Sequence, residues 1–280
     1  MSLKRGRSSS PSKQQPDIQE QNDPFKGLNT PFSETSTLGI EMIQIVVGKT
    51  GDQKTFQIHK KILCDRIPYF AQLLKDSHKS IIKYPEADPN TFDVLVEWTH
   101  TDCLRGIYML QKEEGPTIAT YRSSWSTKSL YLLAENLILP DLMDRLMEVD
   151  RRLDCSYNTR YYPGIINYIY NRTPKSSKLR RFVAELTAHA IRNSDGKFPL
   201  STADLLSAME NKEFALDYLE ISRRPNIEDP RTGSGCRFHV HGKNEKCTAK
   251  DHCGEGKVTA LSVEELKKRI ASALKKPRLH

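Results

Sequence analysis

A short segment near the C-terminal end carries six side chains that could bind a metal ion. They lie within 18 positions and are Cys236, His239, His241, Cys247, His252 and Cys253. Zinc accepts mixed cysteine and histidine ligands, and its structural sites use four of them with no water left for catalysis. Four residues separate Cys236 from His241, and five separate Cys247 from Cys253. This spacing predicts one structural Zn²⁺ held by Cys236, His241, Cys247 and Cys253.

Other assignments of the same segment remain open. His239 and His252 are alternative ligands, because the spacings Cys236-x-x-His239 and Cys247-x4-His252 are also acceptable. No pair has the tight Cys-x-x-Cys spacing of a standard zinc finger, and a loop that carries these residues without a metal explains the pattern equally well. The segment has few large apolar residues, so an ion would have to supply most of its folding free energy.

Other reactive side chains do not form a catalytic set. His59 stands where a strand meets a helix, and no serine, cysteine or carboxylate follows at a catalytic spacing, which favours a structural role. Cys64 lies in an apolar stretch and is expected to be a buried small hydrophobe. Glu113 and Glu114 are adjacent in sequence and would make a poor general acid/base pair. We therefore expect a protein that is not an enzyme.

The composition describes a polar globular chain with charged ends. Of 280 residues, 37% are hydrophobic and 28% are charged, and the formal net charge is +8. Apolar runs fall far short of the ~20 residues that cross a bilayer, and no apolar stretch follows the basic start. We expect an intracellular protein, nuclear or cytoplasmic, and Lys4–Arg7 and Lys275–Arg278 could be read by an import receptor. The remaining basic residues are scattered, which favours a solvated surface over a nucleic-acid interface.

The elements that must position these side chains follow from periodicity. Alternating apolar residues predict strands at 43–47 and 55–58 that form a hairpin, with a third strand at 81–84. Asp88-Pro89 predicts a helix start, and Ser201 and Ser262 begin two capping boxes. Periodicity is lost from 101 to 127, which predicts a long surface insertion. Helical spacing then covers most of 130–192.

Several of these stretches resemble BTB/POZ domains. The stretch Phe56–Leu63 followed by Pro68–Phe70 resembles the family signature, in which the second strand ends in a His-Lys or His-Arg pair. Further similar stretches follow in order at Ile82–Pro89, Phe92–Trp98 and Leu130–Leu137. The later stretches Ile169–Pro174 and Leu179–Arg181 resemble fungal members. Ile67 departs from the family by replacing the usual serine, so partner identity is not carried over.

The resemblance implies an α+β fold, with a small three-stranded sheet capped by helices and an all-helical extension. The expected organisation is a disordered tail (1–36), a BTB/POZ domain (37–155), a helical extension (156–222), a Cys/His-rich loop segment (223–258) and a C-terminal helix with a basic tail (259–280). The resemblance also implies protein partners, through self-association or hetero-association, and adaptor function with a cullin-type ubiquitin ligase. The alternative is a nucleic-acid-associated regulatory protein with a small zinc-binding module.

Overall fold

A three-stranded mixed sheet begins the part of the chain that the structure describes. The computed structural model describes residues 39–75, 80–112, 120–157, 161–193, 200–242, 244–247, 249, 258–261, 264, 265 and 268. The predicted disordered tail at 1–36 lies outside these residues. Strand β1 (Met42–Val47) pairs antiparallel with β2 (Lys54–His59) and parallel with β3 (Ile81–Tyr84), in the order β2-β1-β3. The predicted hairpin and third strand are confirmed.

Helices cover one face of this sheet and build the core with it. Helices α1 (Lys60–Arg66) and α2 (Pro68–Leu74) meet at Ile67, because Pro68 suits a first helical position. Helix α3 (Pro89–Thr101) begins as predicted, with the Asp88 carboxylate accepting a hydrogen bond from the Thr91 amide at 2.7 Å. The core between sheet and helices contains a cluster of aromatic rings, those of Phe56, Phe70, Tyr84 and Phe92.

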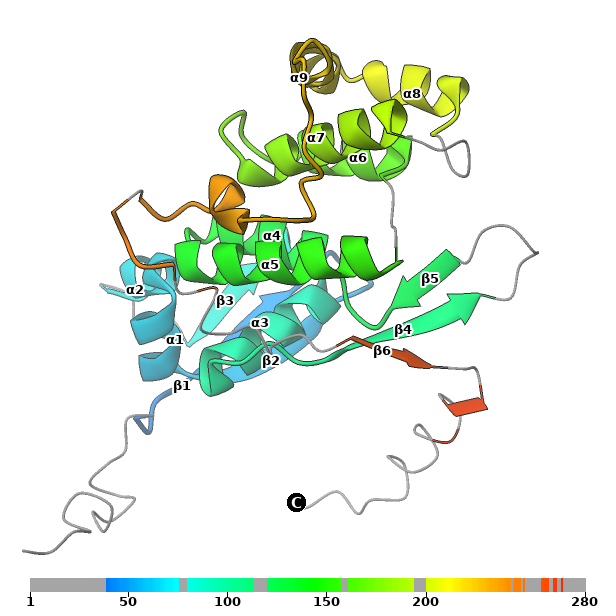
Figure 1. Cartoon of the computed structure of the whole chain (residues 1–280). Coiled ribbons are helices and arrows are strands. Elements are labelled where there is room, and N and C mark those ends of the chain that lie inside the picture. Colours follow the sequence, from blue (N-terminus) through cyan, green and yellow to red (C-terminus); the bar gives the residue numbers. More distant parts are fainter. Residues whose placement is uncertain are drawn as a thin grey trace, which may run out of the picture. The chain divides into compact units, whose positions relative to one another are not determined.

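Among the described residues, six further α-helices follow α3. They are α4 (Thr127–Asn136), α5 (Pro140–Tyr157), α6 (Pro163–Tyr170), α7 (Lys178–Arg192), α8 (Thr202–Met209) and α9 (Lys212–Ser222). Helix α4 packs on α3 and α5, while α6–α9 pack on one another (Figure 1). Ser201 caps α8 as predicted, since its side chain accepts from the amide of Asp204. None of the described helices is both long and apolar enough to span a membrane.

A second small sheet joins two segments that are far apart in sequence. Strand β4 (Ile107–Lys112) pairs antiparallel with β5 (Thr120–Ser123) and parallel with β6 (Val258–Leu261). The insertion predicted at 101–127 thus carries a hairpin, and residues 258–261, where the sequence predicted the end of a loop and the start of a helix, form a strand. These conformations depend on pairing with a strand that is distant in sequence, and such pairing cannot be recognised from the local pattern of apolar residues. Of the helix predicted after Ser262, only Glu264, Glu265 and Lys268 are described, and they are helical.

Helix α5 carries an unusual number of buried charged side chains. Five of them are at most 5% exposed, namely Asp144, Arg145, Asp150, Arg151 and Asp154. A charge is buried at acceptable cost only when it is paired or hydrogen-bonded. Asp150 accepts hydrogen bonds from the hydroxyl of Thr127 and from Lys128, both on α4. The partners of Asp144 and Arg151 come from the segment that contains the Cys/His cluster.

Candidate metal centre

A short 3₁₀ helix, η1 (Gly235–Phe238), presents the first cysteine of the cluster. Phe238 is buried, and its ring lies 5.3 Å from that of Phe182 on α7 at an angle of 80°. The Arg237 guanidinium lies 4.8 Å from the Phe238 ring centroid. Edge-to-face aromatic packing adds to the burial of apolar area. Phe238 therefore anchors the segment between Cys236 and His239.

One face of α5 receives this segment. Asp144, Glu148 and Arg151 are spaced by four and three residues, so they lie along one side of the helix, and we call them the α5 stripe. The Arg151 guanidinium bonds Glu148 at 2.7 Å. It also donates to three backbone carbonyls just before η1, those of Pro230 at 2.9 Å, Thr232 at 3.0 Å and Gly233 at 3.0 Å. Arg151 thus holds the backbone that leads to Cys236.

Asp144 holds the backbone on the other side of η1. Its carboxylate accepts hydrogen bonds from the amides of Val240 at 2.6 Å and His241 at 3.3 Å. Burial raises the pKa of Asp144, and these two amides act against that rise. The α5 stripe therefore binds the segment before and after its 3₁₀ helix. Helix η1 lies against α5 in this arrangement (Figure 1).

Four side chains converge beside the α5 stripe. Cys236, His239, His241 and Cys247 each offer a ligand atom, and these atoms lie within 4.8 Å of one another. The Nδ1 atom of His239 is 3.3 Å from Nε2 of His241 and 3.3 Å from Sγ of Cys247. A tetrahedral zinc ion would place two nitrogen ligands about 3.3 Å apart, and a nitrogen and a sulfur about 3.5 Å apart. These two distances therefore match those of a Cys₂His₂ zinc site.

The histidine rings are oriented by acceptors outside the cluster. Nε2 of His239 lies 3.0 Å from a carboxylate oxygen of Glu148, and Nδ1 of His241 lies 2.9 Å from the carbonyl of Gly242. When these nitrogens carry the proton and donate, Nδ1 of His239 and Nε2 of His241 are left as free lone pairs within the cluster. Metal-binding histidines almost always donate their second ring nitrogen in this way.

The charge state of the cluster also suits a cation. Burial would raise the pKa of the Cys236 thiol, but hydrogen bonds with Ser234, His241 and Cys247 lower it to about 7. The thiolate is the form that binds metals. Burial likewise acts to raise the pKa of Glu148, but hydrogen bonds from His239 and Arg151 bring it below its usual value. A carboxylate therefore stands behind the buried ring of His239.

Three of the four residues that the sequence favoured as ligands lie together, namely Cys236, His241 and Cys247. The fourth, Cys253, lies outside the described residues, as does the alternate His252. His239, the other alternate, completes the cluster and is only 2% exposed. The spacing between Cys236 and His239 already made His239 an alternative ligand. The stronger evidence for it is the contact of its ring with Glu148, a residue 91 positions earlier in the sequence. The cluster could hold a metal ion.

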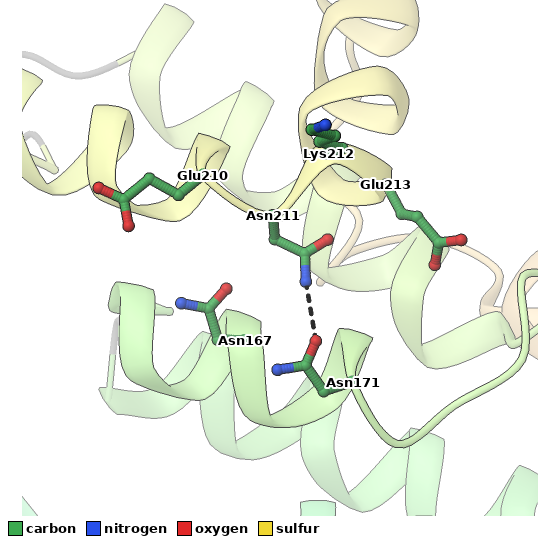
Figure 2. A pocket seen from close by; sticks show the side chains of 6 residues that line it. All are labelled: Asn167, Asn171, Glu210, Asn211, Lys212 and Glu213. Carbon is green, nitrogen blue, oxygen red and sulfur yellow. Dashed lines mark hydrogen bonds between the residues drawn. The ribbon is translucent and has the colours of Figure 1, made fainter.

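A pocket of ≈ 420 Å³ lies between α6 and the turn that joins α8 to α9. Asn211 donates to the side-chain oxygen of Asn171 at 3.2 Å, and its own oxygen caps α9 at Phe214. Figure 2 shows that the carboxylates of Glu210 and Glu213 point away from each other, so they are not placed as an acid/base pair. The polar groups of this pocket join α6 to α9.

Comparison with known families concerns the first sheet and its helices. The family model of the BTB/POZ domain matches residues 43–107. The chain contains a BTB/POZ domain. The match begins in β1 and ends at the first residue of β4, so it includes the sheet β2-β1-β3 and helices α1–α3. The Cys/His cluster lies beyond the matched residues. No curated protein matches the chain.

Proposed function

We propose that this chain is a non-enzymatic protein-interaction protein that associates through its BTB/POZ domain, first of all with a second copy of itself. The match over residues 43–107 carries the proposal, because BTB/POZ domains are interaction modules. The resemblance to fungal members rests on two short stretches of sequence, and the adaptor function with a cullin-type ubiquitin ligase rests on the family alone; both stay predictions.

Exposed apolar side chains on the BTB/POZ domain support association. Tyr69 and Leu73 lie one helical turn apart on α2 and are 41% and 43% exposed. Met42 and Ile81 are exposed on the face of the sheet that the core does not use. Large apolar side chains that gather on a surface often mark a protein interface.

Light scattering on the full chain tests self-association. We expect a dimeric mass for the wild type and a monomeric mass for Leu73→Arg. The matched control is Leu216→Arg, which changes an exposed leucine of α9 outside the matched residues and should leave the dimer intact. A monomeric wild type at every concentration would contradict self-association. Affinity purification with wild type and Leu73→Arg would then test hetero-association. Recovery of no partner would contradict hetero-association, and equal recovery by both would contradict a role for the exposed surface of α2.

The nucleic-acid alternative is less well supported. Arg145, Arg151 and Arg180 are among the chain's positive charges, yet their side chains are only 5%, 4% and 5% exposed. They bind carbonyls and carboxylates of the chain itself, so they are not available to phosphates. The basic runs at Lys4–Arg7 and Lys275–Arg278 lie outside the described residues, and nuclear import stays a prediction.

We also propose that the Cys/His cluster holds one structural Zn²⁺ through Cys236, His239, His241 and Cys247. Its dimensions and the orientation of both histidine rings support this ligand set. Elemental analysis should find about one equivalent of zinc in the purified chain. Cys247→Ser should lose the metal, whereas Cys253→Ser should retain it. Equal loss from both variants would show that Cys253 is a ligand and would contradict the set proposed here.

A further inference from the structure

The α5 stripe is covered by the segment that also carries the Cys/His cluster. Asp144 and Arg151 are each at most 3% exposed, although both are charged. They bond with backbone groups of residues 230–241 and, in the case of Arg151, also with the carboxylate of Glu148. Buried charges that lose their partners are costly. Asp144 and Arg151 of α5 therefore favour the position in which residues 230–241 lie against this helix.

Glu148 connects this docking surface to the cluster. Its carboxylate oxygen bonds Arg151 at 2.7 Å and lies 3.0 Å from Nε2 of His239. The same contact directs Nδ1 of His239 toward Cys247 and His241. The orientation of a cluster side chain is thus set by a residue of α5, and it is correct only when the segment is docked.

We infer that metal binding and the docking of residues 230–241 on α5 are a single coupled equilibrium, with Glu148 as the positioning residue that links them. This inference rests on the proposed zinc site and adds to it a function for the ion. Zinc holds residues 230–241 on α5. Conversely, the docked segment presents His239 to zinc. Because coupling is reciprocal, docking favours zinc binding by the same factor by which zinc favours docking, so a change that disturbs either event must also weaken the other.

Zinc titration of the full chain against a chromophoric chelator measures the first half of the coupling. Loss of the partner that orients a ligand histidine typically costs 10–100-fold in metal affinity. We expect that loss for Glu148→Ala and a smaller one for Glu148→Gln, whose amide oxygen can still accept from His239. Glu210→Gln, a carboxylate change in the α8–α9 turn, is the control and should bind zinc like the wild type.

Cobalt substitution separates failure of this inference from failure of the zinc site. Wild type and Glu148→Ala should both give the visible absorption of tetrahedral Co²⁺ with two thiolates and two imidazoles. Absence of that absorption in the wild type would overturn the site itself. A normal spectrum together with wild-type affinity in Glu148→Ala would leave the site intact and overturn the positioning role of Glu148.

Limited trypsin digestion measures the second half of the coupling. Arg231 and Arg237 lie within the segment that docks on α5, on either side of Gly235, and Arg237 pairs with Glu228 at 3.0 Å. Zinc should slow cleavage after Arg237 in the wild type and protect less in Glu148→Ala at the same zinc concentration. Cleavage that is independent of zinc in a wild type with the cobalt spectrum would show a metal site that is uncoupled from docking.

Discussion

Replacing Gly235 by alanine perturbs the contact between the C-terminal segment and α5 with a single carbon atom. Gly235 is buried and directly precedes Cys236. A Cβ built on Gly235 would overlap the carboxylate of Glu148 and the guanidinium of Arg151. Gly235 is not one of the described glycines that have a positive φ angle, so an alanine at this position should cause no backbone strain. The substitution therefore tests close approach alone.

The size of the effect follows from what must move. Glu148 and Arg151 are held to each other at 2.7 Å, and Glu148 also contacts His239 at 3.0 Å. Either these side chains shift and give up those bonds, or the segment moves away from α5. Overpacking of this kind costs about 1–3 kcal/mol. If docking and zinc binding are coupled, that cost corresponds to roughly a 5- to 150-fold loss of zinc affinity.

Chelator competition measures the affinity, and thermal unfolding with and without zinc measures the coupled stability. The matched control is Gly164→Ala in the first turn of α6, because a Cβ at Gly164 meets no atom within 4 Å. That variant should bind zinc normally. If Gly235→Ala also binds zinc with wild-type affinity, the segment does not approach α5 as closely as described, and the reasoning from the α5 stripe is refuted.

Two predictions concern the BTB/POZ domain itself. Asp88→Ala removes the capping acceptor of α3 and should destabilise the chain by about 1 kcal/mol, as measured by denaturant unfolding. Asp204→Ala, in the first turn of α8, should leave Ser201 able to cap that helix and have a smaller effect, and equal losses would contradict the capping argument. Phe92→Ala empties the centre of the aromatic cluster and should cost about 3–5 kcal/mol, so a change below 1 kcal/mol would show that this ring is not in the core.

The first sheet and its helices could be predicted because their signals are local. Ile43, Ile45 and Val47 alternate along one strand, and a hairpin follows from the turn residues after them. Asp88 and Pro89 mark the start of α3 by chemistry that involves only the first helical turn. Each of these signals is contained within a few residues, so the sequence reports it directly.

Strands β4, β5 and β6 could not be predicted in the same way. Strand β6 has four residues, and its partner β4 lies about 150 positions earlier in the chain. The hydrogen bonds that stabilise such a strand come from a neighbour that no local window contains. For the same reason Glu148 was missed as a contributor to the metal cluster. It contacts His239 only because the segment folds back over α5.

The polar residues of α5 show how a charge pattern can be misread. Asp144, Glu148 and Arg151 recur at helical spacing, which would ordinarily indicate a face in water. Two of the three are almost fully buried, and their acceptors and donors lie in residues 230–241. The apolar side of α5 packs on the BTB/POZ core, and its charged side binds a later segment. The charges on that side are satisfied only when the later segment is present. The docked segment and its Cys/His cluster are therefore part of the same folded structure as α5. A chain cut before residue 230 should lose the backbone groups that bond with Asp144 and Arg151 and should be less stable.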